Sequence, residues 1–209
     1  MLFYDCATAP SPRRARMFIA EKGLEIETRE ISIANGEQLS DAFRAVNPGA
    51  TIPVLITDEG ATLTENLGIA AYLEARFPEP ALMGRSAEEK GAVLMWNAIA
   101  EQQCGAPIAE TLRNSHPSFK DRAITGPANH AQIPELAQRG VARVGAFFAL
   151  LEDRLRDSDF IAGKAFSLAD ITAFVFVDFA RVIKQRIPSE NTATQSWYDA
   201  IRARPSAQL

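Results

Sequence analysis

Cysteine is scarce in this chain of 209 residues, which contains only Cys6 and Cys104. Two cysteines are too few for a disulfide framework or for a metal site built from thiolates. No apolar run reaches the roughly 18 residues of a membrane-spanning helix. The first residues also lack the charged segment, apolar core and cleavage site of a signal peptide. We therefore expect a cytoplasmic protein that has no membrane partner.

Blocks of one charge are also missing, because the 22 basic and 26 acidic residues are dispersed and give a net charge of -4. Without a basic block, nucleic acid and anionic membranes are excluded as main partners. The apolar content of 47% supports a sizeable core, and the length suits one large domain or two small ones.

The first 77 residues alternate short strand patterns with helix patterns. The expected strands are Met1–Tyr4, Glu27–Ile33, Val54–Ile56 and Ala61–Leu63, and the expected helices start at Pro12 (ending at Gly23), at Leu39 (ending at Ala45) and at Leu67 (ending at Arg76). Ser11 is expected to cap the first helix, with Pro12 at its first position. This order of elements predicts a four-stranded mixed sheet with helices on its faces.

The chain beyond residue 86 has only helical patterns. The expected helices are Ala87–Leu112, Gln138–Arg156, Leu168–Lys184 and Gln195–Ala203. Residues 113–134 contain three prolines and are expected to form a long break, which is often functional in such proteins. Ser167 and Asp170 form a capping-box pattern at the start of the most apolar helix, and we interpret Asp170 as a folding residue.

The segment Asn47–Leu55 contains Pro53 between apolar, strand-forming residues. Proline donates no ladder hydrogen bond, so this segment cannot lie inside a sheet and instead offers backbone groups to a ligand. An extended peptide could pair with it as an additional strand. Glu65 and Asn66 open the next helix, where they could hold a charged end of that peptide. Glutathione is the obvious candidate.

Three motifs extend this interpretation: Thr51–Leu55, Glu65–Leu73 and Phe160–Thr172. In this order and spacing they resemble the cytosolic glutathione transferases over nearly the whole chain. The segments Ala9–Arg14, Gly36–Gln38 and Arg113–Pro117 are most similar to the branch named for the second yeast glutathione transferase. The resemblance implies a thioredoxin-like α/β domain over residues 1–78, a linker over 79–86 and an all-helical bundle over 87–209. It also implies a cis bond before Pro53.

The resemblance implies glutathione as a co-substrate, with no tightly bound cofactor and no metal. The backbone of Thr51, Ile52 and Pro53 would pair with the cysteinyl unit of glutathione. Glu65 would lie near the ammonium group of the γ-glutamyl unit, and the Asn66 amide near its carboxylate. Gln38 would reach the glycine carboxylate. Most relatives carry serine at position 66, and the branch often has histidine at position 38.

Ser11 is the candidate for stabilising the glutathione thiolate. It lies where thioredoxin-like proteins carry a Cys-Pro-x-Cys pair, but positions 9–12 contain no cysteine, which disfavours exchange by a protein thiolate. A helix N-terminus and a hydroxyl donor can instead lower the pKa of a thiol. The alternative is that Ser11 only caps its helix. Cys6 is interpreted as a small buried residue, and Thr8 is a weaker candidate for facing the thiol.

The break after residue 112 supplies Asn114 and His116, which could hold a water molecule near the thiol or shape the electrophile pocket. Otherwise His116 is a solvated or capping residue. The resulting hypothesis is a homodimeric, detoxifying transferase that joins glutathione to a small hydrophobic electrophile bound between its domains. The alternatives are a glutathione-dependent peroxide or disulfide reductase and a non-catalytic binding module.

Overall fold

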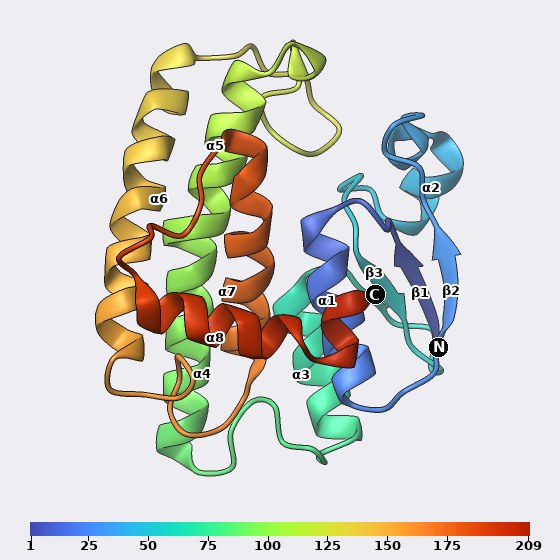
Figure 1. Ribbon diagram of the computed structural model, residues 1–209. Helices are drawn as coiled ribbons and strands as arrows, with labels where there is room; N and C mark the ends of the chain where they lie inside the picture. The colour runs from blue at the N-terminus through green and yellow to red at the C-terminus, as the bar shows by residue number, and fades with distance from the viewer. The chain divides into compact units, whose positions relative to one another are not determined.

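The computed structural model describes residues 1–209, which form two compact units. The first unit comprises Met1–Pro80 together with Thr125–Ala128 and Leu209. The second comprises Ala81–Ile124 and Asn129–Gln208. The residues expected to form a linker, 79–86, are divided between the two units after Pro80. Figure 1 shows that the first unit holds the sheet and that the second is helical.

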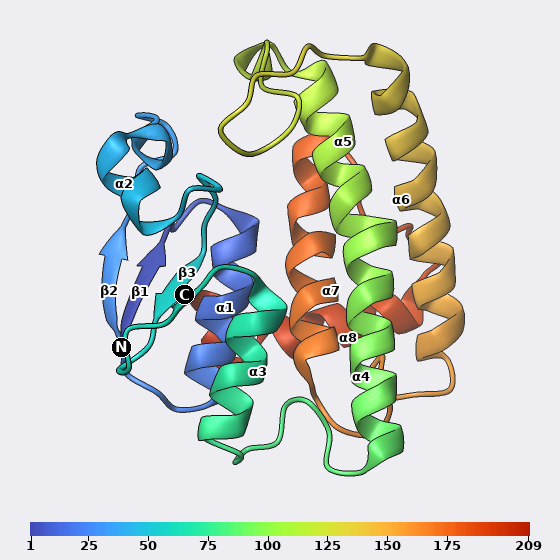
Figure 2. The same ribbon diagram turned by 180° about the vertical axis from the view of Figure 1, so that it is seen from behind.

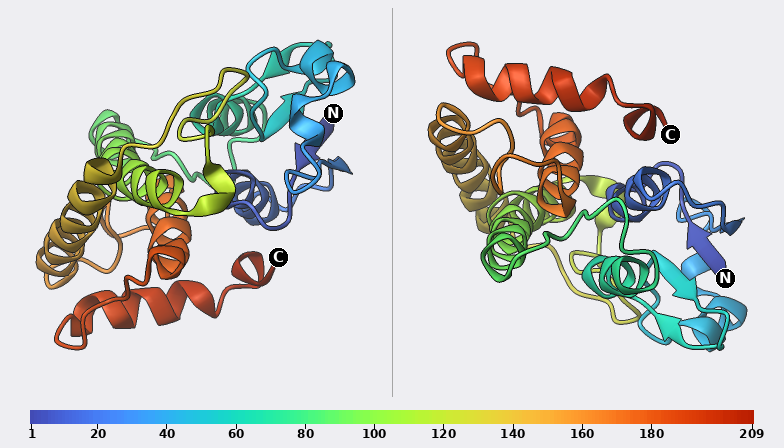
Figure 3. Two further views of the ribbon diagram at one scale, coloured as in Figure 1. Left: turned by 90° about the horizontal axis from the view of Figure 1, so that it is seen from above. Right: turned by 90° about the horizontal axis from the view of Figure 1, so that it is seen from below.

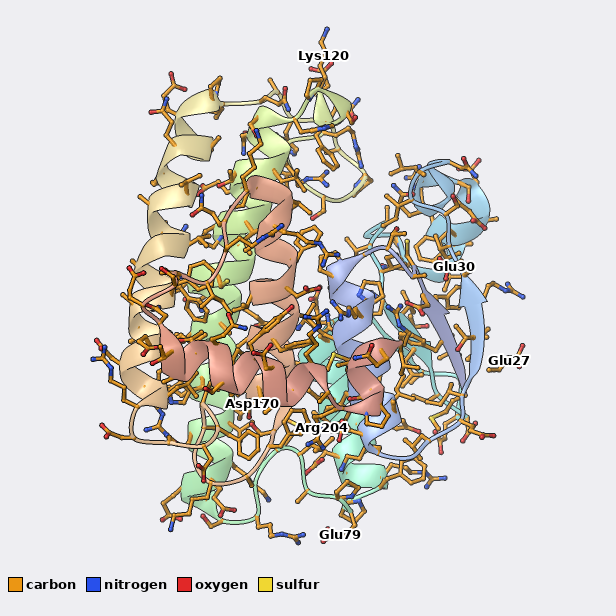
Figure 4. All side chains as sticks on the ribbon, in the orientation of Figure 1. Glu27, Glu30, Glu79, Lys120, Asp170 and Arg204 are labelled. Atoms are coloured by element: carbon orange, nitrogen blue, oxygen red, sulfur yellow. The ribbon has the colours of Figure 1, made fainter.

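The first unit is built on a four-stranded mixed sheet, as predicted. Its strands are β1 (Leu2–Asp5), β2 (Glu27–Glu30), β3 (Val54–Ile56) and β4 (Thr62–Leu63), in the order β2-β1-β3-β4. β1 pairs in parallel with β2, and the other pairs are antiparallel. β2 is an exposed edge strand, on which Glu27 points away from the sheet (Figure 4), whereas the Glu30 carboxylate accepts from the Ala7 N–H at 2.8 Å. Its predicted extension to Ile33 is wrong, because the chain turns where the Glu37 carboxylate accepts from the Ser32 N–H.

Helices α1 (Pro10–Glu21) and α3 (Asn66–Arg76) pack against each other on one face of this sheet (Figure 1). A 3-10 turn (Glu37–Leu39) and α2 (Asp41–Val46) lie between β2 and β3 in the chain. α1 buries Ala15, Phe18 and Ile19, the apolar stripe visible in its sequence. β1 contributes Phe3 and Tyr4 to the buried core. The sheet therefore positions the starts of α1 and α3 beside each other.

The predicted capping of α1 by Ser11 is wrong. The helix begins at Pro10, and Ala9 stands at the N-cap without a side-chain hydrogen bond. Proline suits the first helical position because its fixed φ is already helical and its missing N–H would be unpaired there. The first of the two prolines therefore takes this position, two residues before the predicted start. Ser11 becomes the second residue of the helix.

The second unit contains α4 (Ala87–Ala100), α5 (Ala106–Ser115), α6 (Pro134–Leu155), α7 (Leu168–Phe179) and α8 (Thr192–Arg202). Figure 2 shows α5 and α6 side by side, and Figure 3 shows α8 lying across helices that are seen nearly end-on. The predicted helix Ala87–Leu112 is helical throughout, but a π-helical turn (Glu101–Gly105) inside it separates α4 from α5. At Gly105 a Cβ would lie 2.5 Å from the Phe176 ring, so α7 approaches the backbone closely there. No helix of the structure has the length and apolarity needed to cross a membrane.

Asp170 holds the start of α7, and its predicted folding role is confirmed. It forms a capping box with Ser167, whose N–H and hydroxyl both donate to the Asp170 carboxylate. The same carboxylate accepts from the Ile161 N–H at 2.9 Å and from the Trp197 indole N–H at 3.0 Å. Burial raises the pKa of this carboxyl to about 6. Asp170 thus ties a loop and α8 to the first turn of α7 (Figure 4).

Candidate functional site

The first turns of α1 and α3 meet through their side chains. Asn66, the first residue of α3, donates from Nδ2 to the Oγ of Ser11 over 2.8 Å. Asn66 is buried, with 6% of its surface exposed, and Ser11 is half-buried. Two residues that lie 55 positions apart in the sequence therefore share one polar site. Sequence reasoning named both residues but did not predict that they contact each other.

At the start of α1, Ser11 is the residue that has hydrogen-bond donors available to a ligand. Pro10 and Pro12 have no N–H, and the Arg13 N–H donates to the Ala9 carbonyl at 3.3 Å. The Ser11 N–H is therefore the free backbone donor of this first turn, and the Ser11 hydroxyl lies beside it. Both are at the positive end of the α1 dipole, which favours a negative charge.

The start of α3 is also open. Glu65 stands at the N-cap, is exposed, and makes no side-chain capping bond. Its carbonyl accepts from the Ile69 N–H, which leaves the earlier N–H groups of the helix without intrahelical acceptors. Asn66 Oδ1 is buried and has no hydrogen-bond partner. An anion at the free N–H groups and an amine at Oδ1 and Glu65 would satisfy this helix end.

The segment before β3 presents free backbone groups, as the sequence indicated. The Ile52–Pro53 bond is cis, which confirms the expectation. Neither the N–H nor the carbonyl of Ile52 has a hydrogen-bond partner within the chain. An extended peptide could take up both groups, in the manner of an added strand.

Sequence reasoning missed that Asn47 fixes the shape of this segment. Its Nδ2 donates to the Thr51 carbonyl at 2.8 Å and to Thr51 Oγ1 at 3.1 Å, while its Oδ1 accepts from the Gly49 N–H at 2.9 Å. Asn47 is buried, and Ala50 has a φ of 51°, a conformation that non-glycine residues rarely adopt. The Asn-Pro-Gly triplet was the available signal, because asparagine often bonds the backbone of its own turn.

Gln38 lies on the 3-10 turn Glu37–Leu39 and is half-buried. Its Oε1 is buried without a partner. Its Nε2 makes no hydrogen bond in the chain, so the amide has donors to offer a ligand. Gln38 and Asn66 are thus two residues of this unit whose buried amide oxygens have no partner within the chain.

The loop between β1 and α1 is fixed by Asp5, which the sequence did not single out. The Asp5 carboxylate accepts from Arg16 Nη1 at 2.6 and 2.8 Å and from the Cys6 N–H at 2.7 Å. Cys6 is buried, as predicted, and its sulfur lies 3.5 Å from the hydroxyl of the exposed Thr8. This network holds the chain that leads into Ser11.

Asn114 and His116 make contacts that keep the break after α5 in place. Asn114 is buried, donates from Nδ2 to the Glu110 carbonyl at 2.8 Å, and accepts from the Ile133 N–H at 2.9 Å. Both ends of its amide thus hold this break in place, and its role at the electrophile pocket stays a prediction. His116 is exposed, and its Nδ1 accepts from the Ser118 N–H at 3.2 Å, so it caps the following 3-10 turn. Lys120, farther along this break, points away from the helices (Figure 4).

Comparison with known proteins decides the family. The family model described as "Glutathione S-transferase, N-terminal domain" matches residues 8–76, and that described as "Glutathione S-transferase, C-terminal domain" matches residues 134–200. Glutathione S-transferase 2 of Saccharomyces cerevisiae is 32% identical, over 100% of this chain and 88% of the relative. The chain belongs to the glutathione transferase family. The first match includes all the residues described above at the starts of α1 and α3.

Solved structures of glutathione transferases agree with the fold. The crystal structure of Gtt2 from Saccharomyces cerevisiae has a TM-score of 0.90 at 29% identity and covers 100% of this chain and 99% of its own. A glutathione S-transferase domain-containing protein from Marinobacter aquaeolei has a TM-score of 0.88 at 31% identity, with 99% of both chains covered. The predicted thioredoxin-like domain, helical domain and resemblance to the second yeast enzyme are confirmed.

Proposed function

We propose that this glutathione transferase binds glutathione on its first unit, stabilises the thiolate, and transfers it to a small, hydrophobic electrophile. The observation that carries the proposal is the junction of two open helix N-termini through the Asn66–Ser11 hydrogen bond. Both ends leave donors unpaired, and Asn66 contributes a buried acceptor that the fold does not satisfy. Such a site suits a ligand with an anionic sulfur and a zwitterionic end.

The γ-glutamyl unit provides that zwitterionic end. Its ammonium group would donate to Asn66 Oδ1 and pair with the exposed Glu65 carboxylate. Its carboxylate would accept from the free N–H groups in the first turn of α3. The expectation from sequence placed the Asn66 amide at the carboxylate, whereas one Nδ2 hydrogen is already donated to Ser11. We therefore assign Asn66 Oδ1 to the ammonium group.

The rest of glutathione has matching groups in the same unit. The free N–H and carbonyl of Ile52 would pair with the cysteinyl backbone, supported by Thr51 and Pro53 on either side. Gln38 Nε2 would donate to the glycine carboxylate. With these groups holding it, glutathione would act as a co-substrate.

Ser11 supplies the groups that favour the thiolate. Its hydroxyl and backbone N–H would donate to the sulfur at the positive end of α1, lowering the thiol pKa from about 8.5 toward neutrality. The thiolate then attacks an electrophilic carbon, and the new S–C bond forms as a leaving group departs or an adjacent double bond takes up the electron pair and later a proton. The enzyme contributes thiolate stabilisation and approximation of the reactants. His116 remains a candidate for a further contact to the electrophile.

Calorimetric titration with glutathione, followed by assay with an aryl halide, tests this proposal. We expect saturable binding of glutathione and, with an aryl chloride as the substrate, release of chloride that depends on glutathione. Binding without turnover would favour the non-catalytic module. Reduction of a hydroperoxide with formation of glutathione disulfide, in the absence of conjugation, would favour the reductase. No binding would refute the proposed function.

We also propose a homodimer, the assembly that the resemblance implies. α3 exposes Leu67, and α4 exposes Leu94 and Met95, of which 37%, 40% and 53% are accessible. Burial of such apolar side chains against a second copy would remove them from water. Sedimentation should give about twice 22.8 kDa, whereas a concentration-independent mass of 22.8 kDa would contradict the proposal.

A further inference from the structure

The Asn66 amide lies behind the hydroxyl of Ser11. Nδ2 donates to Ser11 Oγ over 2.8 Å, and Asn66 is held in place by burial. A serine hydroxyl has one hydrogen and two acceptor lone pairs. Because Asn66 occupies a lone pair, the hydroxyl hydrogen must point in another direction, and no acceptor within the chain receives it. Ser11 is therefore left with a donor available to a ligand.

The other end of the same amide is open. Asn66 Oδ1 is buried and has no partner, although a buried acceptor is costly to leave unsatisfied. A ligand N–H that bonds Oδ1 would remove this cost. It would also fix the amide with Nδ2 toward Ser11, because the oxygen and nitrogen of the amide could no longer exchange places without breaking the new bond.

Asparagine can make both contacts at once because its donor and acceptor are different atoms. A serine at position 66 would have a single oxygen with one hydrogen to divide between the ligand and Ser11. Hydrogen bonds in a chain also polarise one another, so a donor behind the Ser11 oxygen strengthens the donation of the Ser11 hydroxyl. The residue at position 66 therefore has a route to influence the sulfur without touching it.

We propose that Asn66 is a positioning residue that acts through Ser11. Its amide is anchored at Oδ1 by the ammonium group of bound glutathione, and it directs the hydroxyl hydrogen of Ser11 to the thiolate. This couples recognition of the γ-glutamyl end to ionisation of the thiol. The inference rests on the proposed function, because it requires glutathione in this site.

The test is the pKa of the thiol of bound glutathione, measured by the ultraviolet absorbance of the thiolate as a function of pH. It is compared in the wild type, Asn66→Ala, Ser11→Ala and the double variant, each saturated with glutathione. We expect each single substitution to raise the pKa by about 0.5–1 unit, the effect of weakening one hydrogen bond to an anion. The double variant should be no higher than Ser11→Ala, because both changes act on one donor.

Glu65→Gln is the matched control. It removes the other proposed contact to the ammonium group and should raise the dissociation constant without raising the thiol pKa. Asn66→Ser is a second variant that keeps a polar group at this position, and it should also raise the pKa. Weaker binding with an unchanged pKa in both Asn66 variants, or additive shifts in the double variant, would overturn the inference. A wild type that does not bind glutathione, or binds it with an ordinary thiol pKa, would instead refute the proposed function.

Discussion

Two helices of the second unit and two of the first have N-termini that are finished in opposite ways. In the second unit, α4 begins with a capping box between Ser86 and Glu89, and α7 with one between Ser167 and Asp170. In the first unit, α1 and α3 begin at Ala9 and Glu65 without any side-chain cap. A cap satisfies the orphan N–H groups of a helix and stabilises the fold.

The uncapped starts of α1 and α3 keep donors that an anionic ligand can use. α2 of the first unit is capped by Ser40, so within this unit α1 and α3 are the α-helices that lack a side-chain cap. These two helices are the ones whose starts are joined by the Asn66–Ser11 bond. Capped ends serve folding, whereas these open ends retain the donors that a ligand needs.

The largest expected effect is the loss of unfolding free energy when the Asp170 cap of α7 is removed. Asp170→Ala removes the acceptor of donors from Ser167, Ile161 and Trp197, all of which lie in buried surroundings. Unsatisfied buried donors each cost about 1–3 kcal/mol, so we expect a loss of unfolding free energy on the order of 3–5 kcal/mol. Urea denaturation measures it. A loss below 1 kcal/mol would show that this cap is dispensable.

The same carboxyl should make stability depend on pH. Burial raises its pKa from 3.8 to about 6 in the folded protein, so folding favours the protonated form. This contribution is fully present below pH 3.8 and is lost as the pH rises through about 6. Relative to Asp170→Asn, the wild type should lose on the order of 2–3 kcal/mol of unfolding free energy over this window. Parallel pH profiles for the two proteins would contradict this.

Glu65→Ala should separate binding from folding. Glu65 is exposed and makes no capping bond, so its removal should change the unfolding free energy by less than about 0.5 kcal/mol. Loss of its charge-assisted contact should weaken glutathione binding by on the order of 1.5–3 kcal/mol in calorimetry. Glu135→Ala, an exposed carboxylate in the first turn of α6, is the control and should leave affinity unchanged. Unchanged affinity in a folded Glu65 variant would remove this residue from the site.

The smallest expected effects come from replacing two serines at helix starts, Ser86 and Ser11, by alanine. Ser86→Ala removes a true cap and should lower stability by about 0.5–2 kcal/mol without affecting glutathione affinity. Ser11→Ala removes no cap but leaves the buried Asn66 Nδ2 without its acceptor, so it should also lower stability, by about 1–3 kcal/mol. Unlike Ser86→Ala, it should also raise the pKa of the bound glutathione thiol. Thermal unfolding measures the stability of both variants, and thiolate absorbance measures the pKa. An unchanged thiol pKa in Ser11→Ala would mean that Ser11 supports the fold and does not act on the thiolate.

Much of this fold could be predicted from local patterns. The period of apolar residues identified the four strands and the helices, and the spacing of Ser167 and Asp170 identified the cap of α7. The errors lie where packing overrides local preference. Two prolines at positions 10 and 12 both suit a helix start, and the sequence does not say which one takes it. The π-helical turn ends at Gly105, where the backbone meets the ring of Phe176, and local patterns do not show a contact between residues so far apart in the chain.

The sequence predicted which residues form the site, but it did not predict which of them contact each other. Ile52, Glu65 and Asn66 stand in motifs that point to a peptide ligand, whatever their neighbours. The Asn66–Ser11 bond and the Asp5–Arg16 pair are tertiary contacts, set by how α1 lies on β1 and α3. For Asn114, the sequence showed only its place in a proline-rich break and suggested a pocket residue. The structure adds that its two amide atoms hold that break together, which the sequence could not show.

The central claim is that the open starts of α1 and α3 bind glutathione and ionise its thiol. The most direct measurement is the pH titration of thiolate absorbance in the wild-type complex with glutathione, against free glutathione under the same conditions. The account predicts a bound thiol pKa at least about one unit below the value of roughly 8.5 for a free thiol. A saturated complex whose thiol titrates at the same pH as free glutathione would contradict it.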